Sequence, residues 1–498
     1  MHVNLFFSLI VMTANVLGSF NDPFEFDGNY GTEADAIRQK VFELVISKEA
    51  LARNLTDSEI EEAREADRQN GPFLYELATS ELIAELSKKQ NELQNFPKED
   101  LDRILHFIQK YQDRKVFHFF RNSPSIFLSL DKILRDKATH EGRNFDLPIL
   151  SSMLILQGQN EKELQSNLLQ TLLTEETLNL VKPRETLQAA LDALDPDFLK
   201  QFLGEEANNQ DLSAFCSPGG QVFFYWLYQA LNLHLISQEP NLISQVNAVK
   251  STFAQTLGDP KVRAEAFKEK LSLADVGVLC TQESDRYLQD ALSRDHLFLP
   301  VDMQNSQDGT FVFLRSDLWE PEYKVIAIDG YEGFERGRLN VILATHQSGE
   351  KFLLASAHGN STRAEDGRLQ ISLIMQHFHT LSQQPENGCL QLLIGIDANT
   401  KTEEDVKALR AHLDALGLVA TSVGPTTIKK RMVTVQHAKA GRAAVDEEDY
   451  LITLKKEQGS HFQFTQQTVG FSSEKPDIKK ALPNLDNLSD HYPVGAEL

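Results

Sequence analysis

The sequence predicts an α/β protein in which stacked mixed or antiparallel sheets accompany a large helical region. Residues 21–270 are rich in Leu, Gln and Glu, and their apolar residues recur three or four positions apart, which is typical of helices facing a core. From about residue 271 onward, short apolar runs dominate instead. Consecutive strands with few helices between them favour mixed or antiparallel sheets over a doubly wound parallel sheet.

The helical region divides at proline and glycine residues. Within 98–119, the residues Leu101, Ile104 and Ile108 fall on one face of a helix. Breaks such as Pro183 separate one periodic stretch from the next. The helices expected on these grounds span 80–94, 98–119, 160–181, 185–203, 221–236 and 240–257.

The second part of the chain contains short apolar runs with the length and composition of strands. These runs are bounded by polar or turn-forming residues, and two helical stretches, 366–384 and 402–416, lie among them. The expected strands are 276–281, 310–315, 324–328, 339–344, 351–357, 390–396, 449–454 and 461–465.

Composition excludes several classes of protein. The chain has 49 Lys and Arg against 72 Asp and Glu, a net charge of −23, which disfavours broad basic surfaces for nucleic acid or anionic membranes. Its 3 cysteines form no CxxC pair, so a disulfide scaffold is not expected. We expect a reduced, cytoplasmic compartment instead. No apolar run is long enough for a transmembrane helix.

The N-terminal apolar segment has two interpretations. Residues 4–20 resemble the apolar core of a signal peptide, but residues 1–20 carry no charged side chain, so the positive leading region is missing. The same residues are equally consistent with a buried strand that ends near Asn15.

Polar residues of chemical interest stand where the apolar runs end. Residues at strand ends project into loops over a rigid sheet, where catalytic groups are commonly placed. Taken singly, each of them is more often a helix cap, an Asx turn or a hydrogen-bonded group than a catalytic residue. Together and in this order they form a pattern: Asn15, Glu283, His358, Asp397 with Asn399, Asp449, and Asp490 with His491.

This order of motifs resembles the endonuclease/exonuclease/phosphatase superfamily, which has the deoxyribonuclease I-like fold, and leans towards its deadenylase-like branch. The resemblance covers residues 5–20 and about 261–498. It rests on the stretches VMTANVLG, GVLCTQESD, LLASAHGNS, LLIGIDANT, EEDYLIT and LPNLDNLSDHYPV. One departure is that Gly395 stands one place earlier than the glycine that usually precedes the catalytic Asp of the family.

The resemblance implies a two-sheet α/β sandwich with helices outside, interrupted after its first core strand by a large α-helical insertion. Residues 1–20 would supply that strand, 21–260 the insertion, and 261–498 the remainder of the catalytic domain. Removal of the first strand by a signal peptidase is then not expected. The Gln- and Asn-rich insertion also has the look of secreted bacterial effectors, so export of that kind remains an alternative to a cytoplasmic location.

The resemblance further implies Mg²⁺ or Mn²⁺ as the cofactor, and both ions favour oxygen ligands. Glu283 would be the principal metal ligand, with Asn15 nearby. Asp490 would complete the acidic site beside the metal and take part in catalysis.

Five further residues would act on the water and the phosphate. Asp397, positioned by Asn399, would orient and deprotonate the water. His491 would contact the phosphate oxygens, with Asp449 orienting its imidazole. His358 would be a second imidazole on the phosphate or the leaving group.

A basic stretch between the Asp397 and Asp449 strands stands out against the acidic chain. It is interpreted either as a solvated basic loop or as a substrate-binding loop that contacts phosphate. The substrate-binding candidates are Lys429, Arg431, Gln436 and Lys439.

The expected activity is metal-dependent hydrolysis of a phosphodiester, with a nuclease acting on RNA or DNA slightly favoured. One alternative is a phosphatase for inositol phosphates or phosphoinositides, or a sphingomyelinase-like phosphodiesterase, because the net charge fits a compact pocket better than a long basic groove. Another is a degenerate scaffold without catalysis. In either case the helical insertion could bind a protein partner.

Overall fold

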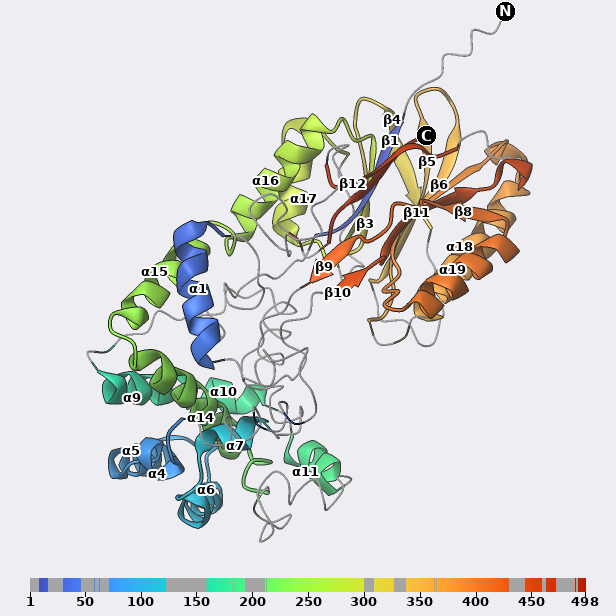
Figure 1. Ribbon diagram of the computed structural model, residues 1–498. Coiled ribbons are helices and arrows are strands. Elements are labelled where there is room, and N and C mark those ends of the chain that lie inside the picture. Colours follow the sequence, from blue (N-terminus) through green and yellow to red (C-terminus); the bar gives the residue numbers. More distant parts are fainter. Residues whose placement is uncertain are drawn as a thin grey trace, which may run out of the picture.

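Two β-sheets and their flanking helices form one part of the protein, and a helical region forms the other (Figure 1). The computed structural model describes residues 9–16, 30–45, 58, 62, 71–121, 158, 160–181, 183–192, 211, 213–299, 309–326, 337–361, 363, 365–429, 444–458, 463–471, 489 and 491–498. No helix in these ranges combines the length and the apolar character needed to cross a bilayer.

The first sheet has five strands in the order β12-β13-β1-β2-β3. Its centre is β1, which pairs in parallel with β2 and antiparallel with β13. Residues 10–15 are therefore a central core strand, as the strand interpretation of the N-terminal segment predicts. The strands are β1 (Ile10–Asn15), β2 (Val278–Gln282), β3 (Phe311–Leu314), β12 (Thr465–Val469) and β13 (Val494–Glu497).

The second sheet has six strands in the order β4-β5-β6-β7-β11-β8, and a separate two-stranded ribbon pairs β9 with β10. Both larger sheets mix parallel and antiparallel pairs, since β6 and β7 run parallel while β7 and β11 run antiparallel. The strands are β4 (Trp319–Val325), β5 (Leu339–His346), β6 (Lys351–His358), β7 (Gln391–Asp397), β8 (Leu418–Ala420), β9 (Thr427–Lys429), β10 (Ala444–Asp446) and β11 (Asp449–Leu454).

The two sheets pack face to face, and helices cover their outer faces. Val11, Val278 and Leu393 belong to the core between the sheets. On the outer face of the six-stranded sheet, α18 (Glu365–Ser382) and α19 (Glu403–Ala415) cover a second core, while α16 (Pro260–Leu273) and α17 (Arg286–Ser293) cover the five-stranded sheet (Figure 1). The expected sandwich with helices outside is confirmed.

Between β1 and β2 in the chain lies the helical region, whose core is separate from those of the sandwich. At its centre is α14 (Pro218–Ser237), which begins after the N-cap Ser217 and is apolar on nearly every side, so neighbouring helices surround it. The others are α1 (Thr32–Val45), α4 (Leu74–Leu77), α5 (Ser80–Glu92), α6 (Lys98–Tyr111), α7 (Val116–Arg121), α9 (Glu161–Leu172), α10 (Glu175–Leu180), α11 (Arg184–Asp192) and α15 (Leu242–Ala254).

Two stretches expected as single helices are each divided in two. The stretch 98–119 forms α6 and α7, and 160–181 forms α9 and α10. In the second case the side chain of Thr174 accepts a hydrogen bond from the backbone of Thr177, and so caps a new helix within the apolar repeat. Local capping therefore divides a pattern whose periodicity alone indicates one helix.

Gly395 of β7 lies against β1 and β2 of the facing sheet. A Cβ atom at this position would lie 2.9 Å from Thr13 Cβ and closer still to Cys280 Cβ. The absence of a side chain at position 395 therefore allows β7 to lie directly against β1 and β2.

Substituting Gly395→Ala should destabilise the fold by about 1–3 kcal/mol, because the added methyl group overpacks the space between the sheets. Chemical denaturation followed by circular dichroism measures the change in the free energy of unfolding. The matched control is Gly367→Ala in α18, where a Cβ would make only ordinary contacts at 3.4 Å. A Gly395→Ala protein as stable as the Gly367→Ala protein would contradict the close packing described for β7.

Candidate active site

Strand register brings the polar strand ends to one edge of the sandwich. In the six-stranded sheet, Asp397 of β7 is paired with His358 of β6 on one side and with Asp449 of β11 on the other. In the facing sheet, Asn15 ends β1 beside Gln282 at the end of β2. Residues that are distant in sequence are thus held together by backbone pairing.

One half of the site joins the two sheets through Asn15. Its side-chain Nδ2 donates to Asp397 Oδ2 at 3.0 Å and to Glu283 Oε1 at 3.2 Å. His358 Nε2 lies 3.7 Å from each of the same two oxygens. Asn15, His358 and Asp397 are buried, whereas the Glu283 side chain is 37% exposed, so an ion from solvent can reach this carboxylate.

The turn after β2 aims Glu283 towards this site. Glu283 adopts a φ of 54°, a left-handed conformation that is unfavourable for a residue with a side chain. The next residue, Ser284, anchors the turn by donating its backbone N–H and its hydroxyl to the carbonyl of Gly309. The strained backbone is thus held by its neighbour, which keeps the carboxylate at the edge of the sheet.

Asn399 supports Asp397 mainly through its backbone. Its N–H donates to Asp397 Oδ1 at 2.9 Å, while its side-chain Nδ2 donates to the carbonyl of Gly359 at 2.9 Å. The Asp397 carboxylate therefore accepts hydrogen bonds at both oxygens, one from Asn399 and one from Asn15. The side chain of Asn399 instead joins the loops that follow β6 and β7.

The other half of the site is a buried chain of hydrogen bonds that holds His491. Its Nδ1 lies 2.8 Å from Asp449 Oδ2, and the hydroxyl of Thr426 donates to the same oxygen at 2.7 Å. The Thr426 hydroxyl also accepts the backbone N–H groups of Glu448 and Asp449. Ser489 joins this half to β1, because it accepts from the backbone of His491 and donates to the carbonyl of Asn15.

Burial governs the charge of Asp449. The residue is fully buried, and this raises the pKa of its carboxyl group, while His491 and the Thr426 hydroxyl oppose the rise. Its second oxygen, Oδ1, is buried with no hydrogen-bond partner in the described structure. The imidazole that Asp449 orients is therefore the main group opposing the rise of its pKa.

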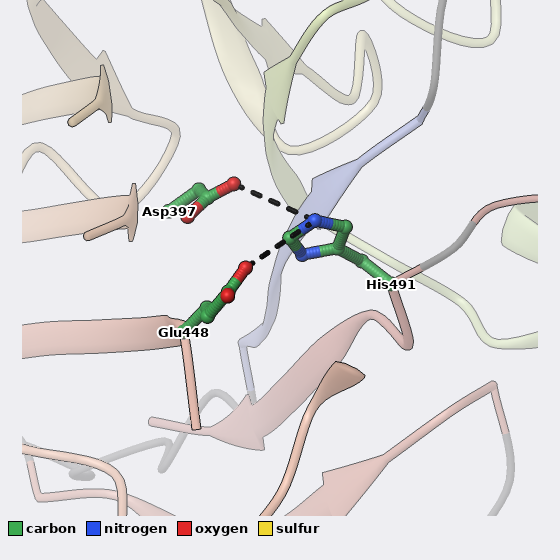
Figure 2. Close-up of side chains that lie close together, drawn as sticks. All are labelled: Asp397, Glu448 and His491. Carbon is green, nitrogen blue, oxygen red and sulfur yellow. Dashed lines mark ion pairs between the residues drawn. The ribbon is translucent and has the colours of Figure 1, made fainter. Parts of the chain in front are cut away.

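Glu448 is a site residue that the sequence analysis misses. It is 1% exposed, and its Oε2 lies 3.7 Å from Nε2 of His491 (Figure 2). Asp397, Glu448 and His491 offer three ligand atoms within 4.8 Å of one another, a candidate metal site. The adjoining Glu447 instead pairs with Arg410, so the sequence alone does not tell which of these neighbouring acids points into the site.

The structure brings together seven of the residues expected from the sequence: Asn15, Glu283, His358, Asp397, Asn399, Asp449 and His491. Asp490, Arg431, Gln436 and Lys439 lie outside the described residues. The backbone of Lys429 ends β9, a ribbon strand whose first residue, Thr427, forms a β-bridge with His491, but its side chain also lies outside the description. Thr426, like Glu448, was not expected in the site.

Comparisons with known proteins give distant structural similarities. No family model matches the chain, and neither does any curated protein. Truncated TDP2 of Caenorhabditis elegans is similar with a TM-score of 0.33 and 18% identity, over 48% of this chain and 90% of that one. The endonuclease domain of TRAS1, a telomere-specific non-LTR retrotransposon, has a TM-score of 0.31 and 14% identity, over 49% of this chain and 94% of that one. The mannosyl-6-phosphatase Bt3783 of Bacteroides thetaiotaomicron has a TM-score of 0.34 and 13% identity, over 50% of this chain and 94% of that one.

Replacing Thr426 by Val should destabilise the protein by about 2–4 kcal/mol, because two backbone N–H groups and a buried carboxylate lose a partner. Part of this loss should grow as the pH rises. The hydroxyl restrains the raised pKa of Asp449, and without it ionisation of the carboxyl group costs more. Urea denaturation at several pH values measures both effects.

Two variants serve as controls for this substitution. Thr426→Ser keeps the hydroxyl and should restore most of the stability. Thr465→Val removes an exposed hydroxyl that donates to the Glu497 carbonyl at 3.2 Å, and should change stability by no more than about 0.5 kcal/mol. Equal losses for Thr426→Val and Thr426→Ser would show that the hydroxyl does not hold Asp449.

Proposed function

We propose that this protein is a metal-dependent phosphoesterase that hydrolyses a phosphodiester, with a nuclease acting on RNA or DNA as the favoured form. The observation that carries the proposal is the meeting of two imidazoles and several carboxylates at one edge of the sandwich, with His491 held by Asp449 and its Nε2 beside Asp397. The order of these residues along the chain supports the same conclusion.

Asp397 is suited to orient water and accept its proton. Its Oδ1 is fixed by the backbone N–H of Asn399, and its Oδ2 accepts from Asn15 while lying 3.7 Å from both imidazoles. Such a fixed carboxylate serves as a general base when water is within hydrogen-bond reach.

The two imidazoles are suited to the phosphate and the leaving oxygen. His491 keeps Nδ1 on Asp449, so that Nε2 faces the reacting groups. His358 Nε2 lies on the other side of Asp397, where it can donate a proton to the leaving oxygen.

The residues at the Glu283 side fit Mg²⁺ or Mn²⁺. Glu283 offers carboxylate oxygens, which these ions prefer, and is accessible from solvent. Asn15 would bind the same ion through its amide oxygen after a flip of the amide, whose Nδ2 now donates to Glu283. An ion bound there supplies positive charge for the phosphate oxygens. Asp490, next to His491 in the chain, is proposed to complete this set.

A phosphatase acting on phosphorylated inositols is the second candidate. The net charge of −23 favours a compact phosphate pocket over an extended basic groove. Assays with single-stranded RNA, single-stranded DNA and inositol polyphosphates separate the two candidates by which substrate is hydrolysed.

Hydrolysis of bis-p-nitrophenyl phosphate should require Mg²⁺ or Mn²⁺, and Glu283→Gln should lower the rate by at least about 10²-fold because it removes the accessible carboxylate. Product absorbance measures the rate, and circular dichroism checks the fold. The control is Glu403→Gln, in which the charge lost is an exposed one on α19. Undiminished hydrolysis in excess chelator would refute the metal-dependent mechanism.

Asp449→Asn and His491→Ala should each lower the rate by about 10²–10⁴-fold, since either change disables the same hydrogen-bonded unit. The double variant should be scarcely slower than the slower single one, because residues that act as a unit are not additive. Single-turnover kinetics of the three variants measure this coupling. His379→Ala, an exposed imidazole on α18, is the control, and losses that multiply in the double variant would show separate roles.

A further inference from the structure

A cavity of about 380 Å³ lies beside the five-stranded sheet, at the edge opposite the candidate active site. Strand register fixes this position. β2 ends at Gln282, beside Asn15 of the candidate active site, whereas the cavity lies where β2 begins and where its antiparallel partner β3 ends. Residues from the end of α16 and from the 3₁₀ turn Arg294–His296 complete its wall. The volume falls in the range of about 300–1,000 Å³ that is usual for ligand sites, and none of the lining residues has a role in the proposed hydrolysis.

The buried lining of the cavity is apolar, and polar residues stand at its rim. Leu271, Val276 and Phe298 line it and are only 1–2% exposed. Ser272 and Ser316 also line it, and their hydroxyls donate to backbone carbonyls, which leaves oxygen lone pairs that can accept from a ligand. An apolar lining with a few polar groups around it is the usual composition of a site that binds a small molecule.

An arginine held by two aspartates forms the charged part of the rim. Nε and Nη2 of Arg315 donate to the two carboxylate oxygens of Asp317 at 2.7 and 3.2 Å, and Nη1 donates to Asp275. The side chains of Asp275 and Asp317 are 73% and 66% exposed, against 16% for Arg315. With histidine counted as neutral, two negative charges and one positive charge line the cavity, and the negative ones face solvent.

This arrangement favours an organic cation as the ligand. Each nitrogen of the Arg315 guanidinium group already donates to an aspartate, and an anion that approached it would meet two exposed carboxylates first. A cation meets the same carboxylates with the favourable sign. An aliphatic stem on that cation would also cover Leu271 and Val276, which a hydrated metal ion would leave in contact with water.

We propose that the cavity binds an aliphatic guanidinium or ammonium group, with its charge on the exposed sides of Asp275 and Asp317 and its stem on the apolar lining. Two sources carry such a group: a small free amine, and an Arg or Lys side chain of a peptide. Leu273, next to Ser272, is 82% exposed and offers apolar surface beside the cavity, so a peptide should bind more tightly than a free amine. The site is independent of the proposed hydrolysis.

The test is calorimetric titration of the full-length protein with agmatine, an aliphatic guanidinium, and with succinate, an anion of similar length. Agmatine should bind and succinate should not. Methyl NMR locates the ligand, because the shift changes should centre on the methyl groups of Leu271, Val276 and Leu297. The peptide acetyl-Leu-Arg-amide should bind more tightly than agmatine, and its uncharged analogue with citrulline in place of Arg should not bind.

Variants of the rim test the charge. Asp317→Asn should weaken agmatine binding by about fivefold, the upper range for an exposed charge pair. Asp275→Asn combined with Asp317→Asn leaves Arg315 as the unmatched charge, so this double variant should lose agmatine and bind succinate instead. The matched control is Asp414→Asn, which removes an acid that is 72% exposed and paired with Lys455, outside the cavity lining. It should bind as the wild type does, and circular dichroism checks the fold of each variant.

A wild type that binds neither agmatine nor the Arg peptide, or methyl shift changes that spare the cavity, would overturn the proposal. So would a folded double variant that binds agmatine as tightly as the wild type. Tighter binding of the peptide, with the difference lost in Leu273→Ser, would identify a peptide side chain as the ligand, whereas equal binding would identify a free amine. Either result stands whether or not the protein hydrolyses a phosphate ester.

Discussion

The pairing of β7 with both of its neighbours is the constraint on which the site depends. Asp397 ends β7 between His358 of β6 and Asp449 of β11, so three reactive side chains are set by one register. A slip of one residue would turn each of them to the opposite face of the sheet. Gly395 contributes to the same constraint, because its lack of a side chain lets β7 lie against β1 and β2 and brings Asn15 within reach of Asp397.

This register has an electrostatic cost. It gathers carboxylates in a buried place, and burial raises the pKa of Asp449. Among the described residues, the groups that offset this cost include the Asn15 amide, the Thr426 hydroxyl and the two imidazoles.

The strand-end residues could be predicted from the sequence, because each of them follows or begins an apolar run that is long enough to be a strand. Glu283, His358 and Asp397 could be placed in this way, and their meeting followed from the resemblance. Glu448 could not be assigned to the site, because it lies in a run of acidic residues just before β11 begins. No alternation of polar and apolar residues there shows which acid points inward. A hydroxyl such as that of Thr426 carries no sequence signal at all, since its role depends on contacts made across 23 residues.

Parallel pairing of β1 and β2 explains how the sandwich tolerates the helical region. Because β1 and β2 are parallel, the chain must return from the C-terminal end of β1 to the opposite end of the sheet, where β2 begins. The entropic cost of closing such a connection rises only slowly with its length. The helical region has its own hydrophobic core around α14, so its helices pack on one another rather than on the sheets. The helix that follows this region, α16, packs on the five-stranded sheet and leads to the start of β2.

The direction of β1 then decides where this region is attached. Because β1 ends at Asn15, the chain leaves the sheet at the edge that holds the candidate active site, and it returns to the opposite edge through α16. An insertion at the other end of β1 would have been remote from the reacting groups. At this end, the strand that precedes the helical region supplies Asn15, whose amide holds both Glu283 and Asp397.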